Sequence, residues 1–342
     1  MRIAIVNDMA LAIEALKRLV TSVPGHQIAW TARDGATALE RCARDRPDLL
    51  LMDLFMPGMS GVECTRRIMA SAPCPILIVT STVEGSYAEV YDAMGHGALD
   101  AVDTPVLGLS GSLAGGAALL AKVAIIGKLV AARGPSARRP SRATRPPAAG
   151  AALVAIGAST GGPAALSEVL SGLGVRFAGA VLIVQHVDQH FARGLASWLT
   201  DHSRFPAELA EEGARPRAGV ALIAATADHL IMRADGTLGY DRKPVDLAYR
   251  PSVDVLFHSL VAHGPRHGVA ALLTGMGRDG AAGLLALRRR GWSTIAQDEA
   301  SSVVYGMPRA ALELGAAEQV LPIGRVGAAI AGAVVAGRAE TA

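Results

Sequence analysis

One apolar stretch of the chain runs directly into a turn of small residues, and this junction limits the folds that the chain can adopt. Leu153–Ile156 has the character of a buried strand, and Ala164–Leu173 has the character of a helix that starts near Pro163. The turn between them has the spacing Gly-x-Ser-x-Gly centred on Ser159. A strand, a sharp turn with a serine and a helix form a nucleophile elbow in an α/β sheet. Such a serine needs a base and an orienting acid from elsewhere in the chain.

The composition predicts two domains and excludes several functions. The chain has 342 residues, of which 51% are hydrophobic, so at roughly 150 residues per domain each half can bury a core. A net charge of only +3 argues against a dedicated nucleic-acid binder. The most apolar region, 106–132, is interrupted by lysines and glycines, so we expect no membrane insertion. Three cysteines without metal-ligand spacing, and no signal peptide, predict a cytoplasmic protein.

The first half alternates short apolar strands with helical segments, which predicts a doubly wound parallel sheet. Asp8, Asp53 and Thr80 each stand at or directly after the end of an expected strand, at the edge where such sheets bind ligands. Two carboxylates at one edge repel each other, and Mg²⁺ would relieve this repulsion. The alternative is that all three are solvent-facing polar residues. The expected strands are 3–6, 28–32, 48–52, 76–79 and 98–102.

A segment rich in arginine and proline separates the two halves. Residues 133–150 carry no acidic residue and no apolar periodicity, which is typical of an interdomain linker. Binding of nucleic acid or anionic lipid by this basic run is the less favoured alternative. We therefore expect a first domain over 1–125, a linker over 126–150 and a second domain over 151–342.

The second half supplies partners for Ser159. His186 ends the apolar strand that begins at residue 180, and Asp279 follows the apolar strand that begins at residue 269. In a parallel sheet these residues meet at one edge, where Ser159 would attack an acyl carbon, His186 would take the proton and Asp279 would orient the imidazole. The backbone N–H groups of Thr160 and Met276 are the candidates to stabilise an oxyanion.

Other interpretations of these residues stay open. His190 lies close by and is a second candidate base, and Asp279 is also placed to cap a helix. The Ser159 turn could bind a dinucleotide phosphate instead, although it lacks the P-loop lysine and the G-x-G-x-x-G spacing.

The first half resembles a response-regulator receiver domain, a flavodoxin-like doubly wound parallel sheet. The resemblance rests on Asp53 with the loop Met56–Gly61 after it, on Asp8 and on Thr80. It implies that Asp53 accepts a phosphoryl group from a sensor histidine kinase, that Asp8 and Asp53 bind Mg²⁺, and that Thr80 senses the phosphoryl group.

Three positions depart from the receiver pattern. Asn7 stands where receivers usually carry the first of two acidic residues, and Thr104 stands where they usually carry a lysine. Ala101 occupies the usual aromatic switch position. Loss of the lysine removes a charge that would pair with the phosphoryl group, so we expect weaker control by phosphorylation.

The second half resembles the catalytic domain of the CheB family, the chemotaxis response-regulator protein-glutamate methylesterases. The resemblance implies a doubly wound α/β methylesterase domain with Ser159, His186 and Asp279 as its triad and no cofactor for catalysis. It also implies hydrolysis of glutamyl methyl esters, and deamidation of glutamines, on methyl-accepting receptors. The motifs that carry it are Gly157–Pro163, Gln185–His186, Tyr249–Asp254, Leu273–Gly280 and Gln297–Ser302.

Two short segments point to a subgroup. Ile5–Met9 and Val102–Pro105 look closer to the methylesterase of Wsp-type surface-sensing systems than to the flagellar enzyme. The alternative function is a response regulator with a non-catalytic binding output domain, although the second half has no helix-turn-helix signature. A nicotinamide-dependent oxidoreductase is a third hypothesis.

Overall fold

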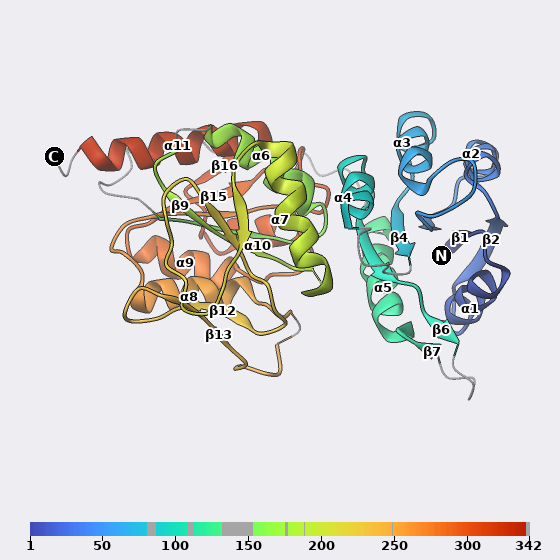
Figure 1. Cartoon of the computed structure of the whole chain (residues 1–342), viewed down its shortest axis with the longest axis horizontal. Coiled ribbons are helices and arrows are strands. Elements are labelled where there is room, and N and C mark those ends of the chain that lie inside the picture. The colour runs from blue at the N-terminus through green and yellow to red at the C-terminus, as the bar shows by residue number, and fades with distance from the viewer. Residues whose placement is uncertain are drawn as a thin grey trace. The chain divides into compact units, whose positions relative to one another are not determined.

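The computed structural model describes residues 1–80, 87–107, 113–131, 153–174, 177–187, 189–247 and 249–339. The chain divides into two compact units, Met1–Ala137 and Arg138–Ala342 (Figure 1). Each unit is built on its own parallel sheet, which confirms the predicted α/β architecture.

The first unit has a five-stranded parallel sheet in the order β2-β1-β3-β4-β5. This is the flavodoxin-like order, in which the strand order reverses between β1 and β3. Its elements are β1 (Arg2–Val6), α1 (Ala10–Thr21), β2 (Gln27–Ala32), α2 (Gly35–Arg44), β3 (Leu49–Met52), α3 (Gly61–Ser71), β4 (Ile76–Thr80), α4 (Tyr87–Gly95), β5 (Asp100–Asp103), β6 (Val106–Leu107), β7 (Leu113–Ala114) and α5 (Gly116–Ala131).

The apolar runs that predicted the central strands of this unit are buried throughout. Every residue of β3 and β4 is buried, as expected for a parallel sheet covered on both faces. The parallel register pairs Val6 with Met52, the last residues of β1 and β3. Asp8 and Asp53 follow these paired ends, so the fold brings them to the same edge of the sheet.

The structure corrects the expected start of the linker. Helix α5 continues to Ala131, six residues beyond the expected end of the first domain at residue 125. Ile126 in that stretch is buried and belongs to the core of the first unit. The apolar region that we excluded as a membrane span therefore supplies a packing helix. The rest of the expected linker, 132–150, lies outside the described residues.

The second unit has a seven-stranded parallel sheet in the order β10-β11-β9-β8-β14-β15-β16 and a separate antiparallel pair, β12-β13. Its elements are β8 (Leu153–Ala158), α6 (Gly162–Leu173), β9 (Ala180–Gln185), α7 (Gln189–Ser203), β10 (Ala207–Leu209), β11 (Ala221–Ile223), β12 (His229–Met232), β13 (Leu238–Asp241), α8 (Val253–His263), β14 (Val269–Leu272), α9 (Ala281–Arg289), β15 (Ser293–Gln297), α10 (Met307–Glu313), β16 (Gln319–Leu321) and α11 (Ile323–Ala339).

The strand order of this sheet reverses beside β8, because the chain adds β9 on one side of β8 and β14 on the other. Such a switch point opens a crevice at the carboxyl ends of the strands. The register pairs Ala158 with Gln185 and Gly157 with Leu272. The turns after β8, β9 and β14 therefore emerge side by side at one edge.

The helices cover both faces of the second sheet (Figure 1). Alternate strand residues such as Leu153 and Ala155 share one core with Leu256 of α8 and Leu284 of α9. Helix α8 comes closest at Gly157, where an added Cβ would lie 2.4 Å from the Val253 Cγ1 atom. A glycine is therefore required in β8 for the first turn of α8 to reach the strand.

None of the helices in the described part of the chain combines the length and the hydropathy needed to span a bilayer.

The C-terminal end of α7 gives a stability prediction. Arg204, directly after α7, has a φ of 58°, a left-handed conformation that disfavours side chains with a Cβ. We expect Arg204→Gly to raise the free energy of unfolding by about 0.5–1 kcal/mol, because glycine adopts this conformation without steric cost. Urea unfolding of the full chain measures the change. Arg204→Ala is the control, since alanine keeps the Cβ; an equal gain in both variants would contradict the explanation.

Candidate active site

The three predicted catalytic residues follow three adjacent strands of the second sheet. Ser159 follows β8, His186 follows β9, and Asp279 lies in the turn between β14 and α9. The His186 Nε2 atom lies 2.8 Å from Asp279 Oδ2, and both side chains are less than one-tenth exposed. The structure thus brings together two residues that are 93 positions apart in the sequence.

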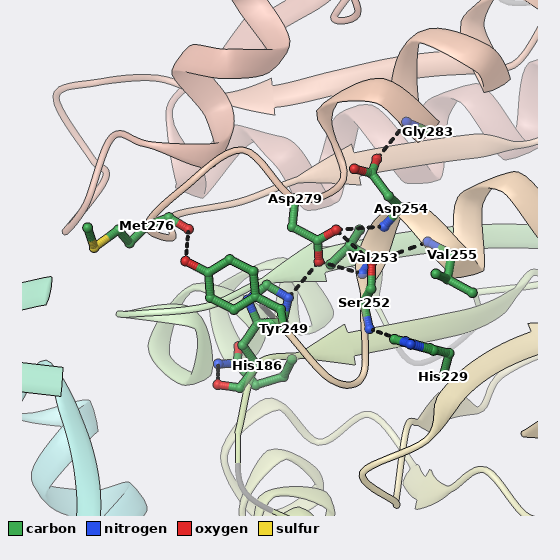
Figure 2. A network of polar contacts seen from close by, with 11 residues as sticks. His186, His229, Tyr249, Ser252, Val253, Asp254, Val255, Met276, Asp279 and Gly283 are labelled. Carbon is green, nitrogen blue, oxygen red and sulfur yellow. Dashed lines mark hydrogen bonds and ion pairs between the residues drawn. The ribbon is translucent and has the colours of Figure 1, made fainter. Parts of the chain in front are cut away.

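The Asp279 carboxylate is held by the first turn of α8 (Figure 2). Its Oδ2 atom accepts a hydrogen bond from the Val253 N–H at 2.7 Å, besides the bond to His186. Its Oδ1 atom accepts from the Ser252 hydroxyl at 2.7 Å and from the Asp254 N–H at 3.1 Å. The positive end of the helix dipole therefore faces a carboxylate.

These contacts keep Asp279 ionised. Burial acts to raise the pKa of its carboxyl, but the hydrogen bond and charge of His186 and the hydrogen bonds from Ser252 and Val253 outweigh burial. The pKa of Asp279 consequently lies below its ordinary value. An ionised Asp279 accepts a hydrogen bond from the Nε2–H group of His186, so the lone pair of the neutral ring lies on Nδ1.

Nδ1 is therefore the basic atom that His186 offers. It is buried and, among the described residues, has no hydrogen-bond partner. The ring is also fixed from the side, because Tyr249 stacks on it with ring centroids 4.4 Å apart and an interplanar angle of 2° (Figure 2). A buried base without a partner is available to take a proton from a nucleophile or a water molecule.

Ser159 lies at the expected edge but does not yet share a proton with His186. Its backbone N–H donates to the Thr274 carbonyl at 3.0 Å, and its carbonyl accepts from Gln185 Nε2 at 2.9 Å. Between the described side chains, no hydrogen bond joins the Ser159 hydroxyl to the His186 ring. Catalytic hydrogen bonds often tighten only when substrate is bound.

The two candidate oxyanion donors lie in the turns that follow β8 and β14. Thr160 is in the turn before α6, and Met276 is in the turn after β14. Within the described ranges, neither backbone N–H donates to a protein acceptor. Both N–H groups are therefore free to bind a developing negative charge.

Tyr249 and Ser252 are functional candidates that we did not single out individually from the sequence. The Tyr249 hydroxyl donates to the Met276 carbonyl at 3.4 Å, so this side chain links the His186 ring to the Met276 turn. Burial, and then the charge of Asp279, raise the pKa of the Tyr249 phenol, which keeps it a donor. Both residues lie in a motif that carried the family resemblance, but their spacing alone did not reveal these contacts. The side chain of His190, the second candidate base, lies outside the described residues.

The first unit places Asp53 at the predicted edge in a buried position. One carboxylate oxygen accepts from the Leu54 N–H at 2.7 Å, and the other accepts from the Asn7 side-chain amide at 2.9 Å. Burial raises the pKa of Asp53 against the lowering effect of the Phe55 and Leu54 N–H groups and of the Thr80 hydroxyl, and the nearby charge of Asp8 raises it further. This excess of negative charge fits a hard divalent cation.

The other positions of the receiver pattern determine which side chains could bind a cation beside Asp53. Asp8 is exposed at the edge, whereas Thr80 is fully buried. The Thr80 hydroxyl makes no hydrogen bond of ordinary length among the described residues, but it lies close enough to Asp53 to act on the pKa of that carboxyl. Asn7 gives its amide hydrogen to Asp53 and so supplies no charge toward a cation. No cluster of three or more histidine, cysteine or acidic side chains suited to a metal occurs among the described residues. A cation would therefore depend on Asp8 and Asp53.

The raised pKa of Asp53 predicts a pH-dependent stability. A raised pKa means that the folded state favours the protonated form of Asp53. The resulting stabilisation of the fold is complete below the pKa of Asp53 in the unfolded chain, about 3.9, and is lost as pH rises through its higher pKa in the folded chain. Asp53→Asn cannot ionise, so we expect its stability advantage to grow between about pH 4 and pH 7. Hydrogen exchange in β1 and β3 of the full chain measures this. Exposed Glu40→Gln is the control, and a pH-independent difference for Asp53→Asn would contradict the prediction.

Comparison with known proteins agrees with this arrangement in both units. Residues 3–107 match the response regulator receiver domain family, and residues 154–330 match the CheB methylesterase family. A solved relative is the CheB methylesterase catalytic domain of Thermotoga maritima, which is 31% identical. The match covers 53% of this chain and 98% of that domain, with a TM-score of 0.51.

Curated relatives match nearly the whole chain. A protein-glutamate methylesterase/protein-glutamine glutaminase of Burkholderia thailandensis is 54% identical over 95% of this chain and 95% of its own length. A protein of the same name from Mesorhizobium japonicum is 52% identical over 96% of this chain and 98% of its own length. With a receiver domain, a methylesterase domain and this identity across both, the chain belongs to the CheB family of protein-glutamate methylesterases/protein-glutamine glutaminases.

Proposed function

We propose that this chain is a phosphorylation-regulated serine hydrolase that demethylates glutamyl methyl esters and deamidates glutamines on methyl-accepting receptors. The observation that carries the proposal is the buried, unpartnered Nδ1 of His186, fixed by Asp279 at the edge where the Ser159 turn emerges. A binding domain has no need of a base without a partner. This feature therefore favours an enzyme over the alternative of a non-catalytic output domain.

The geometry supports an acyl-transfer reaction in two stages. In the first, the Ser159 hydroxyl oxygen attacks the glutamyl carbonyl carbon while His186 Nδ1 takes the hydroxyl proton. The tetrahedral intermediate then expels methoxide, which receives that proton and leaves as methanol. In the second stage, water attacks the acyl-enzyme with His186 again as the base, and the proton returns to Ser159. The products are a glutamate side chain and free enzyme.

Neighbouring groups lower the barrier of both stages. Asp279 stabilises the imidazolium that forms when Nδ1 takes a proton. The N–H groups of Thr160 and Met276 are proposed to bind the oxyanion. A glutamine amide reacts through the same two stages and releases ammonia. Because ammonia is a poorer leaving group than methanol, we expect slower deamidation. No cofactor is needed in either reaction.

The first unit is proposed to regulate the second. Asp53 would accept a phosphoryl group from a sensor histidine kinase, with Asp8 and Asp53 holding Mg²⁺, which would neutralise charge on the phosphoryl oxygens. The buried Thr80 hydroxyl, which already acts on the Asp53 carboxyl, is proposed to donate a hydrogen bond to the phosphoryl group. The protein is expected to work in the cytoplasm, where the methylated helices of such receptors lie.

The pathway is proposed to be a Wsp-type surface-sensing system rather than flagellar chemotaxis. The support is the sequence of Ile5–Met9 and Val102–Pro105, which flank the Asp53 edge at the ends of β1 and β5. In such a pathway, demethylation of the receptor resets the kinase that it controls.

Replacing the nucleophile tests the proposed reaction. We expect Ser159→Ala to lower methanol release from methylated receptor by about 10⁴-fold or more, because the acyl-enzyme cannot form. The matched control is Ser171→Ala, which alters an exposed serine of α6 and should keep full activity. Methanol released per enzyme is measured on candidate methylated receptors. Undiminished release by Ser159→Ala would refute the proposed function.

Restoring the receiver lysine tests the proposed regulation. Thr104 lies after β5, and its N–H donates to the Thr80 carbonyl at 3.0 Å, so a lysine here would start from the same edge as Thr80. We expect a small-molecule phosphodonor to stimulate methanol release more strongly in Thr104→Lys than in the unaltered chain, because the ammonium would pair with the phosphoryl group. Asp53→Ala should abolish stimulation in both backgrounds. Equal, large stimulation with and without the lysine would show that Thr104 does not weaken the control of activity by phosphorylation.

A further inference from the structure

Three of the four hydrogen bonds to Asp279 come from Ser252, Val253 and Asp254, so the position of its carboxylate depends on where α8 begins. Ser252 is the N-cap of that helix and is itself buried. Its hydroxyl donates to Asp279 and accepts from the Val255 N–H at 3.4 Å. The contact that fixes the Ser252 backbone therefore also fixes the catalytic carboxylate.

That contact is made by a histidine outside the proposed triad. The Ser252 N–H donates to the Nδ1 atom of His229 at 3.0 Å (Figure 2). The other ring nitrogen, Nε2, lies 2.9 Å from the Pro244 carbonyl oxygen. His229 is the first residue of β12 and is completely buried.

The two partners determine the form of the His229 ring. A backbone N–H can only donate, so Nδ1 carries a lone pair, and a carbonyl can only accept, so Nε2 carries the hydrogen. The ring is therefore neutral and both of its nitrogens are used. A buried ring held at both ends leaves little freedom to the group that it anchors.

We propose that His229 is a positioning residue for the hydrolysis, acting through the backbone of Ser252 to hold Asp279 against His186. The inference rests on the proposed function, since it concerns the same Asp279. Without an acceptor at the Nδ1 position, the buried Ser252 N–H loses its partner. The first turn of α8 then shifts, and Asp279 shifts with it. Small displacements of catalytic groups reduce the rate far more than they reduce substrate binding.

Two amide variants test the contacts of the two His229 ring nitrogens separately. The side chain of His229→Asn places its amide near the Nδ1 position and can accept from Ser252, but it is too short to reach Pro244. The longer side chain of His229→Gln places its amide near the Nε2 position and keeps only the Pro244 contact. His263→Gln is the matched control, because it alters an exposed histidine at the C-terminal end of α8.

Steady-state methanol release by the full chain is the readout. We expect His229→Gln to lower kcat by about 10- to 100-fold with KM nearly unchanged, and His229→Asn to retain kcat within about threefold. A merely structural role predicts a lower urea midpoint for both variants and the unaltered kcat for the folded protein. Unchanged kcat in His229→Gln, or a collapse of kcat in folded His229→Asn, would overturn the inference. Absence of activity in the unaltered chain and His263→Gln would instead refute the proposed function, and this inference with it.

A spectroscopic measurement tests the ring directly and does not depend on activity. In the unaltered chain labelled with ¹⁵N-histidine, nuclear magnetic resonance should show His229 as the neutral form with hydrogen on Nε2. Assignment uses the loss of one signal set in His229→Gln. A hydrogen on Nδ1 would overturn the proposed contact with Ser252.

Discussion

The arrangement of the second unit depends on a buried negative charge placed against the start of a helix. Asp279 loses water on folding, and the N–H groups at the start of α8 replace that water with oriented donors. The same carboxylate then determines which nitrogen of His186 carries hydrogen. One ionised side chain thereby joins helix packing to acid–base chemistry, and this is why Gly157 must let α8 approach β8 so closely.

Both units use the same topological rule for different chemistry. In each, the strand order reverses beside the first strand, and the polar residues at the carboxyl ends of neighbouring strands gather there. In the first unit the gathered groups are carboxylates and a hydroxyl, which suit a cation and a phosphoryl group. In the second they are a hydroxyl, an imidazole and a carboxylate, which suit acyl transfer. The strand order of each sheet thus brings residues that are far apart in the sequence to one edge.

Sequence patterns were sufficient where one strand or one turn decided the outcome. Apolar runs predicted β1, β3, β4, β8, β9 and β14, and the polar residues after them identified Asp53, His186 and Asp279. They were insufficient where contacts join separate elements. The stack of Tyr249 on His186 and the anchoring of Ser252 by His229 depend on a short antiparallel pair and loops whose periodicity is weak. Likewise, the expected end of the first domain at residue 125 falls inside α5, which contains no proline and continues to Ala131.

The choice of Nδ1 over Nε2 limits how the imidazole of His186 can move. Nδ1 is the ring nitrogen nearer the main chain, and the far nitrogen is tied to Asp279. The ring is therefore held between the turn after β9 and the turn after β14, and it has no freedom to rotate toward a departing group. A leaving group must come to the ring to collect its proton. Such a site suits small, mobile alcohols and ammonia, and it is poorly suited to the release of a bulky amine still attached to a polypeptide.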